Sequence, residues 1–334
     1  MSFRTFLGGI LFLLMTGASS FTWASCGSAT CPIDTAGSER REKGWVSLGY
    51  QFEYIEQDQH QIGTRSAAFR EIRGDHDEEF TVNRIHRLLA SLGLTDRLSA
   101  DVQLPVISRS HAHQEGDEHE SWDLNGVGDL SVQTRYAFWK PESLHRPTLS
   151  AILGGEFPTG RHHKKNSKGQ EAEPAIQPGS NSYDLIVGLS SLQTFSIPML
   201  NGQYGTLPVF SSLIGQLNGA GTDDYRLGDT LNVNLGTSYP LSQKFGLLTQ
   251  LNFLVRDRDG IGRTTQEVQK TGGEFLYLSS GVEFRPSPQW RAFALVQIPV
   301  YQRVNSIQVV SDYNVLAGVS YRFQAWGRRR RSML

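Results

Sequence analysis

The sequence predicts an all-β fold: a single antiparallel transmembrane β-barrel of about 12 strands, of the bacterial outer-membrane type. Segments in which apolar and polar side chains alternate recur along the chain, and most are about 10 to 12 residues long. A tilted strand needs about 9–11 residues to cross a bilayer, whereas ordinary strands have about 5–6. The connections tend to alternate between long polar loops and short turns, which is the sidedness typical of such barrels.

Composition is compatible with this fold. The 334-residue chain has a formal net charge of -1, which gives no sign of a nucleic-acid partner. Only 38% of the residues are hydrophobic and the mean hydropathy is -0.34. A barrel needs apolar side chains only at alternate positions, and no run after residue 24 approaches the roughly 18 apolar residues of a helical span.

The first residues have the features of a secretory signal peptide. Arg4 supplies a positive charge, residues 6–15 form an apolar core, and residues 22–24 resemble a cleavage site. We therefore expect residues 1–24 to be removed, with cleavage after Ala24 or Ser25. An uncleaved anchor and a lipoprotein modified at Cys26 are the alternatives.

Residues 25–43 would form an N-terminal periplasmic segment. It contains both cysteines of the chain, Cys26 and Cys31. In an oxidising compartment, cysteines at this spacing can close a small disulfide loop. A metal or redox role is the alternative, and the spacing differs from that of a c-type haem site.

Residues 44–323 are expected to form the barrel. Successive side chains of a strand point to opposite faces, so the apolar set of each segment would face lipid and the polar set the lumen. Segment 126–139 shows the pattern, with Leu130, Val132, Tyr136 and Phe138 on one face and a polar set opposite. The expected strands are 44–55, 80–92, 97–107, 126–139, 148–158, 183–192, 206–217, 230–241, 245–256, 275–285, 290–301 and 313–323.

Two segments fit less well. In 80–92, Arg84 and His86 fall on the apolar face, which indicates either a β-bulge that shifts the register or a strand end that stands above the lipid. Segment 206–217 has the weakest alternation. The connections after the sixth and seventh segments also blur the contrast between long and short.

The connections place both chain ends on one side. An even number of strands leaves both termini in the periplasm, and residues 108–125, rich in His, Glu and Asp, are expected to be an outer loop. Closure of the sheet is required because every backbone N–H and C=O in lipid must be paired internally.

The polar faces supply candidate pore-lining residues of both charge signs. They could select and orient solutes, or they could pair with one another and hold the barrel rigid. The candidates are Glu53, Asp101, Gln103, Asp129, Gln133, Arg135, Glu156, Asp184, Asn232, Asn234, Gln250, Asn252, Arg256, Glu283, Arg291 and Arg322.

Cofactor and catalytic motifs are weak or missing. His111, His113 and His119 lie near several carboxylates and are weak metal candidates. No fixed ligand spacing is present, so a solvated polar loop is the favoured interpretation of these residues. No phosphate-binding loop, dinucleotide-binding motif or serine-hydrolase elbow occurs. We therefore expect no cofactor and no enzymatic activity.

Several short motifs resemble those of a known family. These are Gly126–Leu130 followed by Arg135-Tyr136, Phe157–Gly160, Gln177 with Gly179-Ser180 and Asp184, and Gln297–Gln302. They are similar to motifs of the outer-membrane barrel family labelled with the meta-pathway of phenol degradation. The resemblance spans nearly the whole mature chain. It implies an outer-membrane channel or porin, with aromatic or other small hydrophobic compounds as cargo.

The expected partners are outer-membrane lipid and a small-molecule solute. Residues 324–334 form a C-terminal tail with a basic run, Arg328–Arg331, which is a candidate contact for a periplasmic partner. The alternative to a channel is a structural barrel that holds a periplasmic or electron-transfer partner.

Overall fold

The computed structural model describes residues 42–72, 76–143, 145–199, 202–263 and 268–327. The predicted signal peptide, the cysteine pair and the basic run lie outside these residues. Neither of the two short helices in the described ranges, η1 (Pro174–Ile176) and η2 (Thr222–Asp224), is long and apolar enough to cross a membrane.

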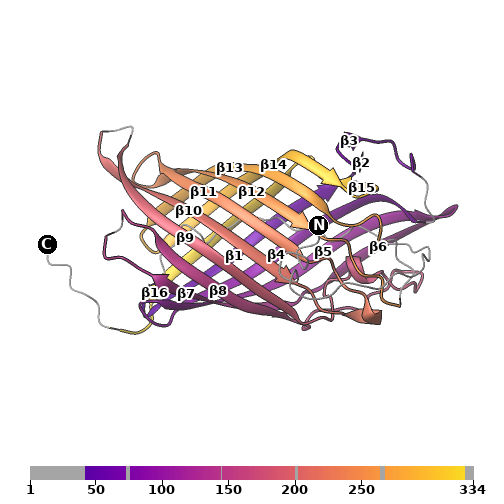
Figure 1. The fold of residues 1–334 in the computed structure, drawn as a ribbon, viewed down its shortest axis with the longest axis horizontal. Helices are drawn as coiled ribbons and strands as arrows, with labels where there is room; N and C mark the ends of the chain where they lie inside the picture. The colour runs from indigo at the N-terminus through magenta and orange to yellow at the C-terminus, as the bar shows by residue number, and fades with distance from the viewer. Residues whose placement is uncertain (1–41, 73–75, 144, 200–201, 264–267, 328–334) are drawn as a thin grey trace, which may run out of the picture.

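The dominant element is a thirteen-stranded antiparallel sheet that closes on itself (Figure 1). Its order is β4-β1-β16-β14-β13-β12-β11-β10-β9-β8-β7-β5-β6, and pairing of β4 with β5 completes the ring. The strands are β1 (Trp45–Gln57), β4 (His76–Gly93), β5 (Leu98–Glu115), β6 (Glu118–Val127), β7 (Leu130–Trp139), β8 (Thr148–Phe157), β9 (Asp184–Pro198), β10 (Tyr204–Leu217), β11 (Thr230–Pro240), β12 (Phe245–Arg256), β13 (Gly273–Ser287), β14 (Trp290–Val304) and β16 (Asn314–Gln324).

Strands β6 and β7 occupy successive positions along one neighbour. Residues 98–103 of β5 pair with β7, and residues 106–115 pair with β6. Together, the two strands therefore fill one strand position in the barrel wall. The wall is a closed barrel of twelve strand positions, as the sequence predicts. A small sheet of β2 (Gln59–Ile62), β3 (Arg65–Ser66) and β15 (Ile307–Val310) lies at one end of the barrel (Figure 1).

Two predictions about the region of β5, β6 and β7 are wrong. Residues 108–125 are not a loop: they form the C-terminal part of β5 and most of β6. Segment 126–139 is not one strand, because it is interrupted at Gly128-Asp129. The interruption lies opposite Pro105 of β5. This proline has no N–H for the ladder, and its carbonyl accepts a hydrogen bond from Gly128 N–H at 2.8 Å. Pro105 lies within β5.

The sidedness of the connections is cleaner than the sequence indicates. Short connections follow β4, β7, β9, β11 and β13, and long ones follow β1, β8, β10, β12 and β14. The connection after β9 is short and the one after β10 is long, so the contrast holds there too. β1 begins and β16 ends on the side of the short turns, because Trp45 pairs with Gln324.

The outer surface is apolar, as lipid contact requires. Leu153, Leu189, Val282 and Ile298 are among the most exposed aliphatic side chains. The irregularity in β4 lies at Glu79, between the paired positions Glu78 and Phe80, so it does not turn Arg84 and His86 inward. On the outer face, tyrosine side chains contact both Arg84 and His86. The Tyr50 hydroxyl and His86 Nδ1 are hydrogen-bonded at 2.7 Å, and the Arg84 guanidinium lies 5.7 Å from the Tyr54 ring centroid.

The inward face carries an apolar cluster that the alternation did not indicate. Leu248, Phe293, Leu295 and Leu316 pack together inside the barrel, on β12, β14 and β16. All four are buried. The interior next to these strands is therefore filled partly by apolar side chains, as in smaller barrels.

We predict that the inner cluster stabilises the barrel more than the outer face does. Leu316→Ala should lower the free energy of unfolding by about 2–4 kcal/mol, because it leaves a cavity in a packed site. Leu235→Ala is the matched control: this leucine is 52% exposed on the outer face, where lipid tails refill the space, and should cost about 1 kcal/mol or less. Urea unfolding in detergent micelles measures both, and equal losses would contradict the packing argument.

Candidate functional site

The lumen wall carries a belt of uncharged polar side chains. Asn252 Nδ2 donates to Asn234 Oδ1 at 2.7 Å, and Asn252 Oδ1 accepts from Ser279 Oγ at 2.6 Å. Gln297 Nε2 donates to Ser279 Oγ at 3.2 Å and its Oε1 accepts from Asn314 Nδ2 at 2.8 Å. The belt thus runs from β11 to β16. Asn252, Ser279 and Gln297 are each 0% exposed, so in this part the wall is closely packed.

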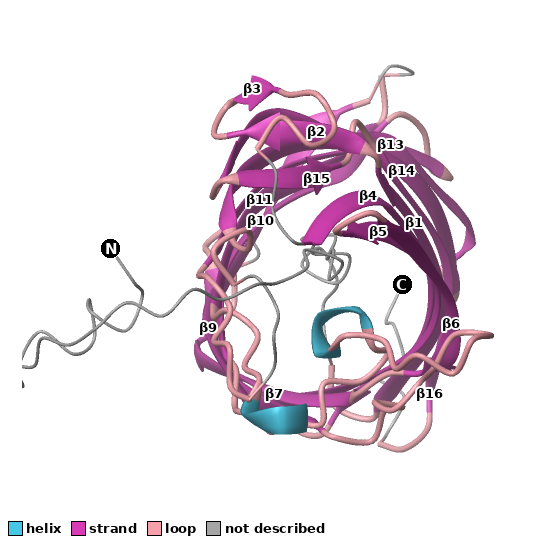
Figure 2. Ribbon diagram, turned by 90° about the vertical axis from the view of Figure 1, so that its right-hand side faces the viewer, coloured by secondary structure: helices cyan, strands magenta, loops and turns pink. Residues whose placement is uncertain are grey.

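The connection between β8 and β9, residues 158–183, folds into the barrel; we call it the inward loop. Figure 2, which looks along the barrel, shows a short helix inside the ring of strands. Ile176 of η1 is 0% exposed and packs with Ala172 against Trp122 and Leu124 of β6. The inner face of the β5–β6 hairpin is therefore covered by the inward loop.

The Asp129 carboxylate fastens both ends of the inward loop. Asp129 Oδ1 accepts a hydrogen bond from Gly160 N–H at 2.8 Å. Asp129 Oδ2 accepts from Ser180 N–H at 2.7 Å and from Ser180 Oγ at 2.8 Å. Asp129 itself is 6% exposed. A buried carboxylate needs several donors, and the interruption between β6 and β7 gives this one three.

Three glycines allow the chain segments to cross at this carboxylate. A Cβ atom on Gly160 would lie 2.7 Å from Gly179 Cα and 2.8 Å from the Gly128 carbonyl carbon. A Cβ on Gly179 would lie 2.6 Å from Gly160 Cα. Any side chain at Gly160 or Gly179 would push the backbones apart. We call Asp129, Gly128, Gly160, Gly179 and Ser180 the clasp.

Two further side chains hold the middle of the inward loop. Gln177 Oε1 accepts from Lys164 N–H at 2.9 Å, and its Nε2 donates to the Ala172 carbonyl at 2.6 Å. Arg109 of β5, buried, donates from Nη1 to the Ile176 carbonyl at 2.6 Å and from Nε to Asn83 at 2.5 Å. The loop is therefore tied to the barrel wall along its length.

Other outer loops pack on the inward loop. Ala175 forms a buried cluster with Tyr225, from the β10–β11 connection, and Val268, from the β12–β13 connection. The Tyr225 hydroxyl donates to Asp259 at 2.6 Å. Burial of this phenol, together with the Asp259 carboxylate, raises the pKa of Tyr225 well above its usual value near 10, so it stays a donor at physiological pH.

Several of the predicted lumen charges have opposite partners. Glu53 accepts from Arg87 Nη2 at 2.9 Å, Arg256 donates to Asp259 at 2.8 Å, and Glu283 is bonded to Arg291. Arg322 stacks on Trp45 at the end with the short turns, with its guanidinium 4.4 Å from the Trp45 ring centroid. Asp184 accepts from Gly219 N–H at 2.9 Å and from Ser182 Oγ at 2.7 Å. These groups hold strands and loops together.

The remaining predicted residues lie along the same wall. Asn234, Gln250 and Asn252 belong to the neutral belt. Asp101 faces Gln133 across β5 and β7, and Glu156 faces Asp184 across β8 and β9. Gln103 and Asn232 are partly buried on β5 and β11. The sequence did not identify Asn83, Arg87 or Arg109 as members of this wall.

A cavity of about 170 Å³ opens at the end with the short turns. Arg135 lies in its wall and donates from Nη1 to Ser190 Oγ at 2.6 Å. The other lining residues include Ser99, Ser150, Ser191 and Ser211 together with Arg97 and Lys140. Asp129 and Arg135, which share one face of segment 126–139, thus have separate roles: the carboxylate holds the clasp and the guanidinium lines the cavity.

The three weak metal candidates also do not come together in one site. His111 and His113 are buried on the inner face of β5, while His119 is exposed and hydrogen-bonded to Glu79 at 3.0 Å. His113, not His119, lies beside two carboxylates, Glu115 and Glu120.

Closed topology, an apolar exterior and a loop folded into the lumen define the class: a transmembrane β-barrel with the fold of outer-membrane channels. An outer membrane channel from Pseudomonas putida F1 matches with a TM-score of 0.60 at 15% identity, over 87% of this chain and 100% of that one. The transport unit of the autotransporter AIDA-I from Escherichia coli matches at 0.48 and 9% identity, over 87% and 93%. A search of curated protein sequences finds no match.

The family profile described as "Putative MetA-pathway of phenol degradation" matches residues 86–289. This is more than half of the 334-residue chain, and the chain therefore belongs to that family. Three motifs that carried the resemblance in the sequence, around Asp129, Gly160 and Ser180, meet in the clasp.

We predict that loss of the Asp129 carboxylate releases the inward loop. Asp129→Ala removes three hydrogen bonds, and a loss of about 2 kcal/mol raises the population of the open loop about 30-fold. Tryptic cleavage after Arg161, Lys164 or Lys165 should accelerate accordingly. Asp123→Ala is the control, because Asp123 is exposed on β6 and accepts a hydrogen bond from Ser110 of the neighbouring strand, not from the inward loop as far as the chain is described. Equal cleavage rates in the wild type and Asp129→Ala would show that the clasp does not hold the loop.

Proposed function

We propose that the protein is a passive channel of the bacterial outer membrane for small solutes, and that its cargo is small aromatic or other hydrophobic compounds. The observation that carries this proposal is the mixed polar and apolar lining of the cavity at the end of the barrel with the short turns. The apolar side chains of Leu98, Ala137 and Leu192 line it beside serine hydroxyls and the Arg135 guanidinium.

Such a wall suits a solute that has both an apolar ring and a polar group. Ion-selective pores use rings of charge, whereas here Glu53 and Glu283 are paired with arginines. The periplasmic cavity, of about 170 Å³, exceeds the roughly 150 Å³ of an engineered cavity that binds benzene. Its serine hydroxyls and Arg135 could hydrogen-bond a hydroxyl or carboxylate group.

Outer-membrane location follows from the same features. The apolar exterior needs lipid, and closure leaves no backbone edge unpaired in it. Membership of the family and the fold shared with an outer membrane channel support the assignment. The alternative, a scaffold barrel, is motivated by Cys26, Cys31 and the C-terminal basic run, which lie outside the described residues.

Planar-bilayer recording tests the channel. The purified, folded barrel should give small discrete conductance steps, and a single-ring aromatic carboxylate such as benzoate should interrupt the current transiently. A hexose of similar size should not. A correctly folded barrel, verified by heat-modifiable migration on a denaturing gel, that remains electrically silent would falsify the proposal.

Charge in the periplasmic cavity should set ion preference. Arg135→Gln removes a positive charge from the cavity wall, so the anion-to-cation permeability ratio, measured from the reversal potential in a salt gradient, should fall about twofold or more. Arg84→Gln is the control, because Arg84 is exposed on the outer face and should leave the ratio unchanged. An unaltered ratio in Arg135→Gln would place the ion path elsewhere.

A further inference from the structure

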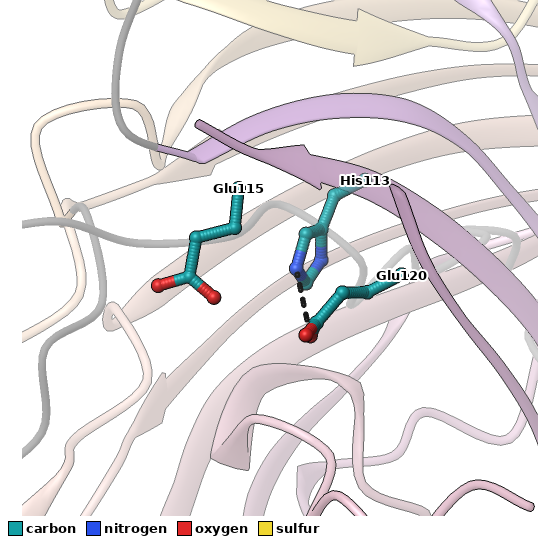
Figure 3. A group of neighbouring side chains, drawn as sticks. All are labelled: His113, Glu115 and Glu120. Atoms are coloured by element: carbon teal, nitrogen blue, oxygen red, sulfur yellow. Dashed lines mark ion pairs between the residues drawn. The ribbon is translucent and has the colours of Figure 1, made fainter. Parts of the chain in front are cut away.

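His113, Glu115 and Glu120 converge at the tip of the β5–β6 hairpin (Figure 3). Their ligand atoms all lie within 4.8 Å of one another, and His113 Nε2 is 3.7 Å from Glu120 Oε2. We propose that these three side chains form a binding site for a divalent transition-metal ion, Zn²⁺ in the first place, on the hairpin beside the inward loop. This inference is independent of the proposed transport function.

The pairing register of the hairpin brings the three together. His113 lies directly opposite Glu120, and Glu115 is two residues farther along the same strand. Side chains at such positions share one face of a sheet. Two carboxylates on one face repel each other, and a cation between them relieves the repulsion.

The imidazole is oriented for metal binding. His113 is 1% exposed, and its ring lies 4.8 Å from the Trp122 ring, centroid to centroid. Its Nδ1 is 3.2 Å from His111 Nε2, and His111 Nδ1 is 2.8 Å from the Thr81 hydroxyl. With the His113 proton on Nδ1, the bond to His111 fixes the ring and Nε2 presents its lone pair toward the glutamates. Metal-binding histidines are commonly held by a second hydrogen bond in this way.

The donor set and spacing favour zinc over a hard cation. One imidazole and two carboxylates bind Zn²⁺ at about 2.0–2.2 Å, with water as a fourth ligand. Ca²⁺ requires about 6–8 oxygen ligands. The donor atoms must move closer by about 1 Å to reach tetrahedral spacing, and the exposed Glu115 side chain has the freedom to do so.

The site also touches the inward loop. Gln170 Nε2 donates to Glu120 Oε1, and Trp122 Nε1 donates to the Gln170 carbonyl at 3.2 Å. A metal on Oε2 leaves Oε1 for Gln170. Metal binding would therefore stiffen the hairpin tip and the inward loop together.

Isothermal titration of the full-length, detergent-solubilised barrel with ZnCl₂, after treatment with a chelator, tests the site. We expect one Zn²⁺ per chain, with affinity reduced about tenfold or more in His113→Ala and in Glu120→Gln. His119→Ala should bind normally, because His119 is exposed and pairs with Glu79. Heat-modifiable migration verifies that each variant is folded.

A second readout separates this site from other histidines. Zn²⁺ should slow tryptic cleavage of the inward loop in the wild type but not in His113→Ala. His163→Ala is a further control, since His163 contacts Glu171 in that loop. Absence of zinc binding by the folded wild type, or binding lost in His163→Ala but kept in His113→Ala, would overturn the proposal.

Discussion

Backbone hydrogen bonding in lipid is the constraint on which the rest of this structure depends. Without water, an open sheet edge would leave a row of N–H and C=O groups unpaired, so β4 must meet β5 and β1 must meet β16. Closure then creates two environments on every strand. Lipid selects apolar residues outside, while the enclosed space must be filled, lined or gated by the residues inside.

The interior divides these tasks by sector. Neutral amides and hydroxyls form the belt from β11 to β16, and Leu248, Phe293, Leu295 and Leu316 fill space on three of the same strands. The β5–β6 side instead receives the inward loop, held by Asp129, Gln177 and Arg109. A loop inserted on one side and packed side chains on the other both narrow a barrel of this size.

The twelve strand positions could be predicted from the sequence because lipid imposes a strict alternation of apolar and polar side chains. The strand prediction was wrong for residues 108–125, where no lipid contact imposes this alternation. The upper parts of β5 and β6 face the inward loop on one side, so Arg109, His111 and His113 alternate with Ser110 and Ala112 and no apolar outer face marks a strand. The inner apolar cluster was missed for the opposite reason. Pairs such as Leu247-Leu248 are apolar on both faces, and this loss of alternation was the available signal.

The clasp was visible only as separate motifs. Nothing in the sequence indicates that Gly160 and Gly179 cross at van der Waals distance beside Asp129, since this depends on the break between β6 and β7. That geometry has a consequence for assembly. Asp129 bonds to residues only 31 and 51 positions away, whereas barrel closure joins the first strand to the last. The inward loop can therefore settle on β5–β9 while the sheet is still open. The interior need not be threaded through a finished ring; the last hairpins can close around it.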